Sequence, residues 1–142
     1  MAEVINVLIV EDDDVDVEVL TRMFKKLAIP NPVYRASNGV QALEIMRGKN
    51  AEQKITQPFI ILLDINMPLM NGAELLQEMR ADNDLKDNVV FILTTSPRQE
   101  DIQMAYDFHA AGYFLKRDSK ELVNLINMYM QLNQFPLVKK SS

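Results

Sequence analysis

Five short apolar runs alternate along the chain with segments of helical periodicity, and this alternation constrains the fold more than any other feature. The runs cover residues 4–10, 33–36, 59–63, 89–93 and 113–115. The third and fourth runs are continuously apolar and the first nearly so, which is typical of parallel strands covered on both faces. We therefore expect a parallel sheet in which a helix connects each strand to the next.

The intervening segments carry the apolar stripes of amphipathic helices. One stripe contains Val19, Leu20, Met23, Phe24 and Leu27, and another contains Leu122, Val123, Ile126, Tyr129 and Met130. Asn38 and Asn71 each precede a glycine, and we expect both to cap the helices that follow.

Strand and helix alternate five times, which predicts an α/β fold with a doubly wound, five-stranded parallel sheet and five helices. With right-handed crossovers, the natural strand order is the flavodoxin-like order 2-1-3-4-5. Such sheets bind their ligands at the carboxyl ends of the strands. Functional residues should therefore directly follow the strands.

The chain has the length and composition of one domain. It has 142 residues, 48% of them hydrophobic, and no cysteine, so one core can form without metals or disulfides. Residues 48–58 and the tail from 133 look like loops, and neither is long enough to separate two domains. We expect a single domain over residues 1–142, with its core at about 4–131 and a C-terminal extension at 132–142.

Charge and hydropathy argue against two broad classes, membrane proteins and nucleic-acid-binding proteins. The N-terminus lacks a basic segment followed by a long apolar stretch, and no apolar run approaches the roughly 20 residues of a membrane span. We therefore expect a cytoplasmic protein without a membrane partner. Fifteen Lys and Arg against twenty Asp and Glu give a formal net charge of −5, which disfavours nucleic-acid binding.

Acids, hydroxyls and one lysine follow the expected strands, and the fold should gather them at one edge of the sheet. They are Glu11, Asp12, Asp13 and Asp14 after the first strand, Asp64 after the third, Thr94, Thr95 and Ser96 after the fourth, and Lys116 after the fifth. Clustered carboxylates repel one another unless a cation offsets them. Oxygen ligands, no cysteine and a single histidine favour Mg²⁺ or Mn²⁺ over zinc.

A carboxylate, a metal ion, a hydroxyl and a lysine together suit phosphoryl transfer through an aspartyl phosphate. Alone, each residue has a simpler interpretation: the acidic run as a solvated helix start, Thr94 as a strand-end hydroxyl, Lys116 as a surface lysine. Asp64 is harder to explain in this way, because an unpaired carboxylate at the end of an apolar strand is costly. The hypothesis therefore depends on these residues lying together at one edge of the sheet. His109 is assigned no functional role.

Four segments together resemble the receiver domains of response regulators, the CheY-like family. Residues 62–72, LLDINMPLMNG, resemble the phosphoacceptor motif, and residues 10–13, VEDD, resemble the acidic pair. Residues 93–95, LTT, resemble the switch hydroxyl segment, and residues 111–116, AGYFLK, resemble the segment with the aromatic switch and the lysine. The resemblance extends over about residues 4–131.

The resemblance implies a role for each matching residue. Asp64 would accept a phosphoryl group from a phosphohistidine on a sensor histidine kinase or a histidine phosphotransfer protein. Asp12, Asp64 and the backbone carbonyl of Asn66 would hold Mg²⁺, with Glu11 acting through water. Lys116 would pair with the phosphoryl group. Thr94 and Tyr113 would move to change the surface of the fourth helix, fifth strand and fifth helix, so the output would be binding.

Within the family, the chain is similar to the stand-alone response regulators of bacterial phytochromes. This more specific resemblance implies a bacteriophytochrome kinase as partner and a homodimer through the last helix and the C-terminal extension. Residues 135–138, FPLV, form an apolar patch in that extension. Packing of this patch on its own domain is an equally good interpretation.

The sequence departs from the family pattern at two positions. Arg117 follows Lys116 where a proline, often in a cis peptide bond, is usual, and a non-proline cis bond costs about 2.5–4 kcal/mol. We therefore expect a differently shaped loop after the fifth strand. Thr95 stands where alanine is common, which would alter access to the acyl phosphate.

Three other interpretations compete with the receiver. A metal-dependent phosphohydrolase would use the same aspartate, but residue 66 is Asn, so no general acid follows Asp64 by two positions. A pseudo-receiver would bind partners constitutively, and the intact set of acids, hydroxyl and lysine argues against it. A flavodoxin-type cofactor protein would place a flavin phosphate beside repelling carboxylates.

Overall fold

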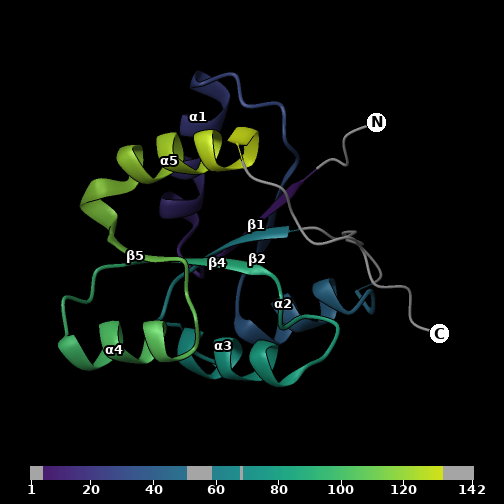
Figure 1. Cartoon of the computed structure of the whole chain (residues 1–142). Coiled ribbons are helices and arrows are strands. Elements are labelled where there is room, and N and C mark those ends of the chain that lie inside the picture. The colour runs from purple at the N-terminus through teal and green to yellow at the C-terminus, as the bar shows by residue number, and fades with distance from the viewer. Residues whose placement is uncertain (1–4, 51–58, 68, 133–142) are drawn as a thin grey trace.

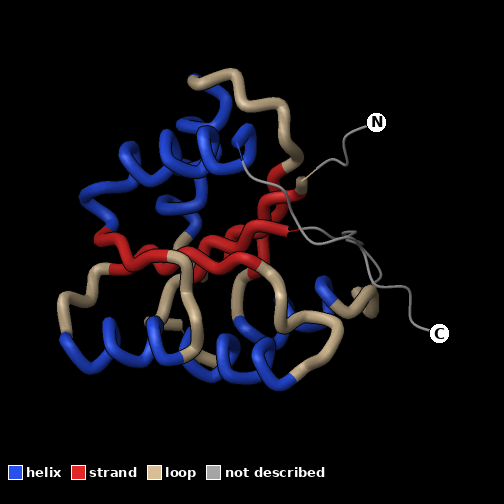
Figure 2. Tube along the Cα trace, in the orientation of Figure 1, coloured by secondary structure: helices blue, strands red, loops and turns tan. Residues whose placement is uncertain are grey.

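The computed structural model describes residues 5–50, 59–67 and 69–132, and they form a five-stranded sheet between two layers of helices (Figures 1 and 2). The strands are β1 (Asn6–Val10), β2 (Val33–Ala36), β3 (Phe59–Leu63), β4 (Val89–Thr94) and β5 (Gly112–Leu115). All pairs are parallel, and the strand order is β2-β1-β3-β4-β5. The predicted fold and strand order are confirmed.

Five α-helices connect or follow the strands: α1 (Asp14–Lys26), α2 (Gly39–Met46), α3 (Gly72–Ala81), α4 (Gln99–Asp107) and α5 (Ser119–Leu132). Figure 1 shows α1 and α5 on one face of the sheet and α2, α3 and α4 on the other. No helix in the described part of the chain is long and apolar enough to cross a membrane.

Two hydrophobic cores, one on each face, explain why the central strands are apolar at every position. Ile60 and Leu62 of β3 pack into the core beneath α1 and α5. Their neighbours Ile61 and Leu63 pack into the core beneath α2, α3 and α4. Alternate side chains of a strand point to opposite faces, so a central parallel strand has no solvent-facing side.

Both predicted asparagine caps are present. The Asn38 side chain accepts a hydrogen bond from the Gln41 amide at 2.8 Å. Asn71 and Glu74 form a reciprocal capping box at the start of α3. These caps satisfy backbone amides that lack partners within the helix. They fix the residues at which α2 and α3 begin.

The apolar stripe predicted for α1 includes residues that the structure leaves partly exposed. Leu20 and Phe24 are buried, whereas 43% of Val19 and 36% of Leu27 is exposed. A helix that packs on one side buries residues four apart most deeply, and its flanking positions remain at the rim. The stripe of α5 agrees with the prediction, because Leu122, Val123, Ile126 and Met130 are buried and Tyr129 packs against the same core.

The segment after β5 forms a 3₁₀ turn, η1 (Lys116–Asp118), that leads directly into α5. Arg117 lies in this turn and is exposed. The Ser119 hydroxyl donates to the Lys116 carbonyl at 2.6 Å, which ties the turn to the first residue of α5. The apolar patch at 135–138 lies outside the described residues.

Candidate functional site

The carboxyl ends of the strands bring together four of the predicted residues. Glu11 follows β1, Asp64 follows β3, Thr94 ends β4 and Lys116 follows β5. Glu11, Asp64 and Thr94 are buried, with exposed fractions of 3%, 5% and 0%. Buried polar groups of this kind require partners. Lys116 is the shared partner of the two carboxylates, and the Ser96 amide donates to the Thr94 hydroxyl.

Lys116 is the centre of the site. Its Nζ atom lies 2.7 Å from Asp16 Oδ2, 2.9 Å from Glu11 Oε2 and 3.0 Å from Asp64 Oδ2. Burial alone would lower the pKa of Lys116, but the hydrogen bonds to its three carboxylate partners outweigh burial and raise that pKa. The lysine therefore stays charged and offsets part of the negative charge around it.

Glu11 is the most perturbed acid of the site. Burial raises the pKa of Glu11 to about 7; the hydrogen bond from Lys116 opposes this change and the negative charge of Asp64 reinforces it. A buried carboxylate with a displaced pKa beside a second carboxylate is typical of a functional site.

Three carboxylates are grouped closely enough to share a cation. Oxygen atoms of Glu11, Asp12 and Asp64 lie within 4.8 Å of one another, with Asp12 exposed and the other two buried. An all-oxygen donor set of this kind fits a hard divalent ion. The other two acids of the run have structural roles: Asp13 caps α1, and Asp14 pairs with Arg35.

The backbone holds Asp64 from several sides. Its amide donates to the Val10 carbonyl at 3.1 Å, and its Oδ1 atom accepts from the Asn66 amide at 3.1 Å. Gly72 packs against this backbone so closely that a Cβ atom there would contact the Asp64 carbonyl and lie 2.7 Å from the Ile65 Cα atom. The start of α3 therefore fixes the position of the aspartate.

The hydroxyl segment connects β4 to β5 and α4. The Tyr113 hydroxyl donates to the Ser96 carbonyl at 2.8 Å, and the Ser96 amide donates to Thr94 Oγ1 at 3.4 Å. Ser96 Oγ donates to Asp101 in the first turn of α4 at 2.6 Å. Thr95 is exposed. Hydrogen bonds through Ser96 therefore link Thr94 to Tyr113 and to the first turn of α4.

Sequence reasoning missed Asp16, the nearest partner of Lys116. A signal was present, because Asp16 lies in the first helical turn after the acidic run, and a carboxylate there is favoured by the helix dipole. It also missed Arg35, whose guanidinium donates to the carbonyls of Glu11 and Asp12. Nothing local in a strand sequence marks such a contact.

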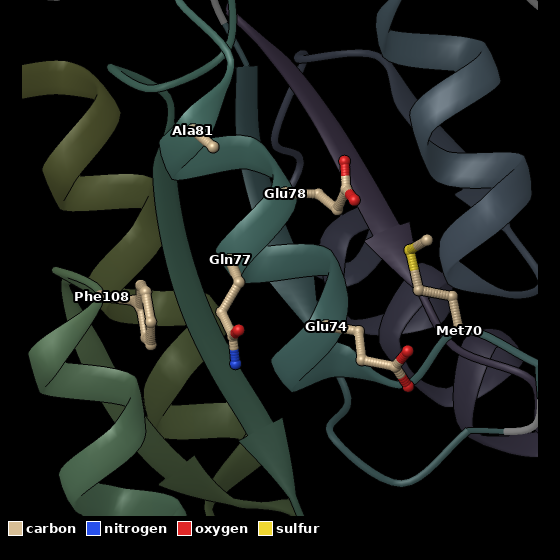
Figure 3. Close-up of a pocket in the computed structure, with 6 residues that line it drawn as sticks. All are labelled: Met70, Glu74, Gln77, Glu78, Ala81 and Phe108. Carbon is tan, nitrogen blue, oxygen red and sulfur yellow. The ribbon is translucent and has the colours of Figure 1, made fainter.

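A groove of about 500 Å³ runs along the outer side of α3, apart from the strand-end residues. Figure 3 shows Glu74, Gln77, Glu78 and Ala81 on this helix, with Met70 on one side and Phe108 on the other. Glu74 is used in the capping box, and Glu78 lies 3.8 Å from Arg47. Both acids have partners, so the groove adds no chemistry to the site.

Comparison with known proteins agrees with this geometry. The family model for the response regulator receiver domain matches residues 7–127. Response regulator Rcp1 of Synechocystis sp. is 30% identical over 129 residues, which cover 91% of this chain and 86% of Rcp1.

Two solved structures of related proteins superpose over nearly the whole chain. One is the phosphorylated cyanobacterial phytochrome response regulator RcpA, with a TM-score of 0.84 and 26% identity over 96% of this chain and 100% of that chain. The other is the Mn²⁺-bound form of Rcp1, with a TM-score of 0.82 and 26% identity over 95% of this chain and 100% of that chain.

The fold and the strand-end carboxylates define a receiver that acts as a signalling switch. The chain belongs to the response regulator receiver domain family. It is a two-component response regulator; phosphorylation on an aspartate is the general mechanism of this family, and the phosphoryl group comes from histidine kinases such as phytochromes. The acidic group and the Mn²⁺-bound relative support a divalent metal ion as cofactor.

Proposed function

We propose that Asp64 is the phosphoacceptor of this response regulator. The observation that carries the proposal is the contact between Asp64 and Lys116, because it places a cation against a buried carboxylate at the carboxyl edge of the sheet. An Asp64 oxygen attacks the phosphorus of a phosphohistidine. A P–O bond forms, the P–N bond breaks, and its electron pair leaves with the imidazole nitrogen.

The neighbouring groups compensate the charge of the phosphoryl group. Lys116 Nζ, already 3.0 Å from Asp64, pairs with a phosphoryl oxygen. Thr94 lies at the end of the adjacent strand and hydrogen-bonds the phosphoryl group after a shift of its segment. Small phosphodonors phosphorylate the same aspartate, and water hydrolyses the acyl phosphate. These are the only reactions that we propose for the protein.

Mg²⁺ is the proposed physiological ion, with Mn²⁺ as a substitute. Asp12, Asp64 and the carbonyl of Asn66 would hold it, and Glu11 would contribute through water. When bound, the ion neutralises charge on the phosphoryl oxygens. The fit rests on the close group of oxygen donors and the absence of any cysteine in the sequence.

The output is a change in binding. Tyr113 turns inward behind Thr94, and the surface of α4, β5 and α5 changes with it. The path of hydrogen bonds from Thr94 through Ser96 to Tyr113 and Asp101 supports this route.

The proposed partners are a sensor histidine kinase of the bacteriophytochrome type or a histidine phosphotransfer protein, in the cytoplasm. Neither a membrane nor a nucleic acid is proposed as a partner. A homodimer through α5 and a C-terminal extension at 132–142 is supported by Leu125, Met128 and Leu132, which are 41%, 57% and 77% exposed along α5. We also propose that residues 1–142 form one receiver domain, with its core at about 4–131.

The test is intact mass after incubation with Mg²⁺ and acetyl phosphate. Wild type should gain one labile phosphoryl group, and the gain should require Mg²⁺. Asp64→Asn should gain none, whereas Asp107→Asn, a matched change of an exposed aspartate on α4, should behave as wild type. Full uptake by the Asp64 variant would overturn the assignment, and no uptake by wild type would favour a constitutive binding module.

Lys116→Ala separates uptake from switching. This variant should keep some phosphorylation, because the nucleophile and the metal ligands remain. The phosphorylated variant should show no change in self-association by light scattering, whereas phosphorylated wild type should. A Lys116 variant that switches as wild type does would remove the lysine from the mechanism.

A further inference from the structure

Lys116 makes more contacts than its role toward a phosphoryl group requires. An ammonium group has three N–H donors, and here carboxylates of Asp16, Glu11 and Asp64 lie at hydrogen-bond distance from it. Asp16 is the nearest of the three, at 2.7 Å. It comes from α1, whereas Glu11 and Asp64 come from the ends of β1 and β3.

Glu11 and Asp64 belong to the group of carboxylates that fits a divalent ion, so the ammonium group and the ion compete for the same oxygens. Among the residues that the structure describes, this metal-binding group comprises Glu11, Asp12 and Asp64, and Asp16 is not one of them. The position of the ammonium group therefore decides how much negative charge remains for the ion.

We propose that Asp16 is a positioning residue that holds the Lys116 ammonium group on the α1 side of the site and so keeps Glu11 and Asp64 available to a divalent ion. This inference rests on the proposed metal site. Asp16 lies in the first turn of α1, where the helix dipole favours a carboxylate. A cavity of about 70 Å³ lined by Glu11, Asp16, Leu20, Lys116 and Ser119, among others, extends from the ammonium group to the buried side of α1.

Loss of Asp16 weakens metal binding for two reasons that act in the same direction. The ammonium group, without its nearest partner, shifts toward Glu11 and Asp64 and neutralises them. The site also loses one negative charge. The first effect passes through Lys116 and the second does not, so a double-mutant cycle separates them.

The experiment is calorimetric titration of the full chain with Mg²⁺. Asp16→Asn should raise the Kd about fivefold, in line with a partly exposed ion pair. Asp14→Asn, which removes the same charge from the same helical turn but has Arg35 as its partner, should change the Kd less than about twofold. Asp16→Glu, which keeps the carboxylate, should restore much of the affinity.

The Lys116→Met background decides whether Asp16 acts through the lysine. In that background, Asp16→Asn should have no larger effect than Asp14→Asn. A fivefold effect that persists without the lysine, or an equal effect of Asp14→Asn, would overturn the positioning role. If wild type binds Mg²⁺ and Asp16→Asn binds equally well, the inference fails while the proposed function stands; if wild type binds no Mg²⁺, both fail.

Discussion

Arg35, in β2, donates two hydrogen bonds to the backbone carbonyl of Glu11, which directly follows β1. Its Nε and Nη2 atoms lie 3.2 and 3.1 Å from the Glu11 carbonyl oxygen, and Nη2 also lies 3.1 Å from the Asp12 carbonyl oxygen. These carbonyls belong to the loop that carries two of the clustered carboxylates. A side chain from the edge strand thus fixes the acidic loop without entering the metal-binding group itself.

Substitution of Arg35 should destabilise this loop. Arg35→Gln should lower the free energy of unfolding by about 1–2 kcal/mol, because the backbone carbonyls of Glu11 and Asp12 lose a charged hydrogen-bond donor. Arg35→Lys should recover less than half of the loss, since an ammonium group cannot reproduce the forked geometry. Urea denaturation measures both, and Arg22→Gln, at an exposed pair with Glu18, should cost about 0–1 kcal/mol. Full recovery by lysine would show that charge alone matters.

Gly72 permits the close approach of α3 to Asp64. Gly72→Ala would place a Cβ atom 2.7 Å from the Ile65 Cα atom and against the Asp64 carbonyl. Backbone atoms cannot turn aside as a side chain can, so we expect a loss of about 2–3 kcal/mol in stability and slower phosphorylation by acetyl phosphate. Urea denaturation and the rate of mass gain report the two effects.

Gly48→Ala is the matched control, because its constraint is different. Gly48 has open space around it but a φ of +71°, so alanine there should cost about 1–2 kcal/mol through backbone conformation. The variant should be phosphorylated at the wild-type rate, since Gly48 follows the C-terminal end of α2 and a Cβ atom there has nothing within 4 Å. Normal phosphorylation of the Gly72 variant would contradict the idea that this contact positions Asp64.

The features that sequence predicted are those set by local pattern. The continuous apolar run 59–63 indicated a strand buried on both faces, and Asn71 before Gly72 indicated a helix start. Asp16 and Arg35 escaped prediction because their partners are distant in the chain: Asp16 bonds to Lys116, 100 positions away. Arg35 contacts backbone carbonyls, which every residue has, so no side-chain pattern identifies them. The exposed Val19 shows that periodicity fixes the direction of a helix face better than its width.

Tyr113 should contribute its ring and its hydroxyl separately. Tyr113→Phe keeps the ring packed on the core and removes the hydrogen bond to the Ser96 carbonyl. We expect a loss of about 1 kcal/mol in stability, measured by urea denaturation. Phosphorylation should stay within about twofold of wild type, because the hydroxyl that is removed donates to the Ser96 carbonyl and not to Asp64. Tyr106→Phe, at a half-exposed tyrosine of α4, is the control. A Tyr113 variant as stable as wild type would mean that the hydroxyl bond contributes nothing.

Glu11 should give the metal-free protein an unusual dependence of stability on pH. Its pKa is raised from 4.5 to about 7, chiefly by burial, so between these values the folded state holds a proton that the unfolded state has released. Raising the pH favours the state that binds fewer protons, which here is the unfolded state. The contribution of Glu11 to stability is therefore fully present below pH 4.5 and is lost as the pH rises through about 7.

Comparison with Glu11→Gln isolates this effect from the other acids. In EDTA at pH 8, the glutamine variant should be more stable than wild type by about 1–3 kcal/mol, because it places no charge in the buried site, and near pH 4.5 the two should have similar stability. Glu121→Gln, at an exposed position on α5, should follow wild type throughout. Urea denaturation at a series of pH values provides the measurement. Parallel curves for wild type and Glu11→Gln would show that burial does not hold a proton on Glu11, and would leave Lys116 as the group that keeps this carboxylate charged.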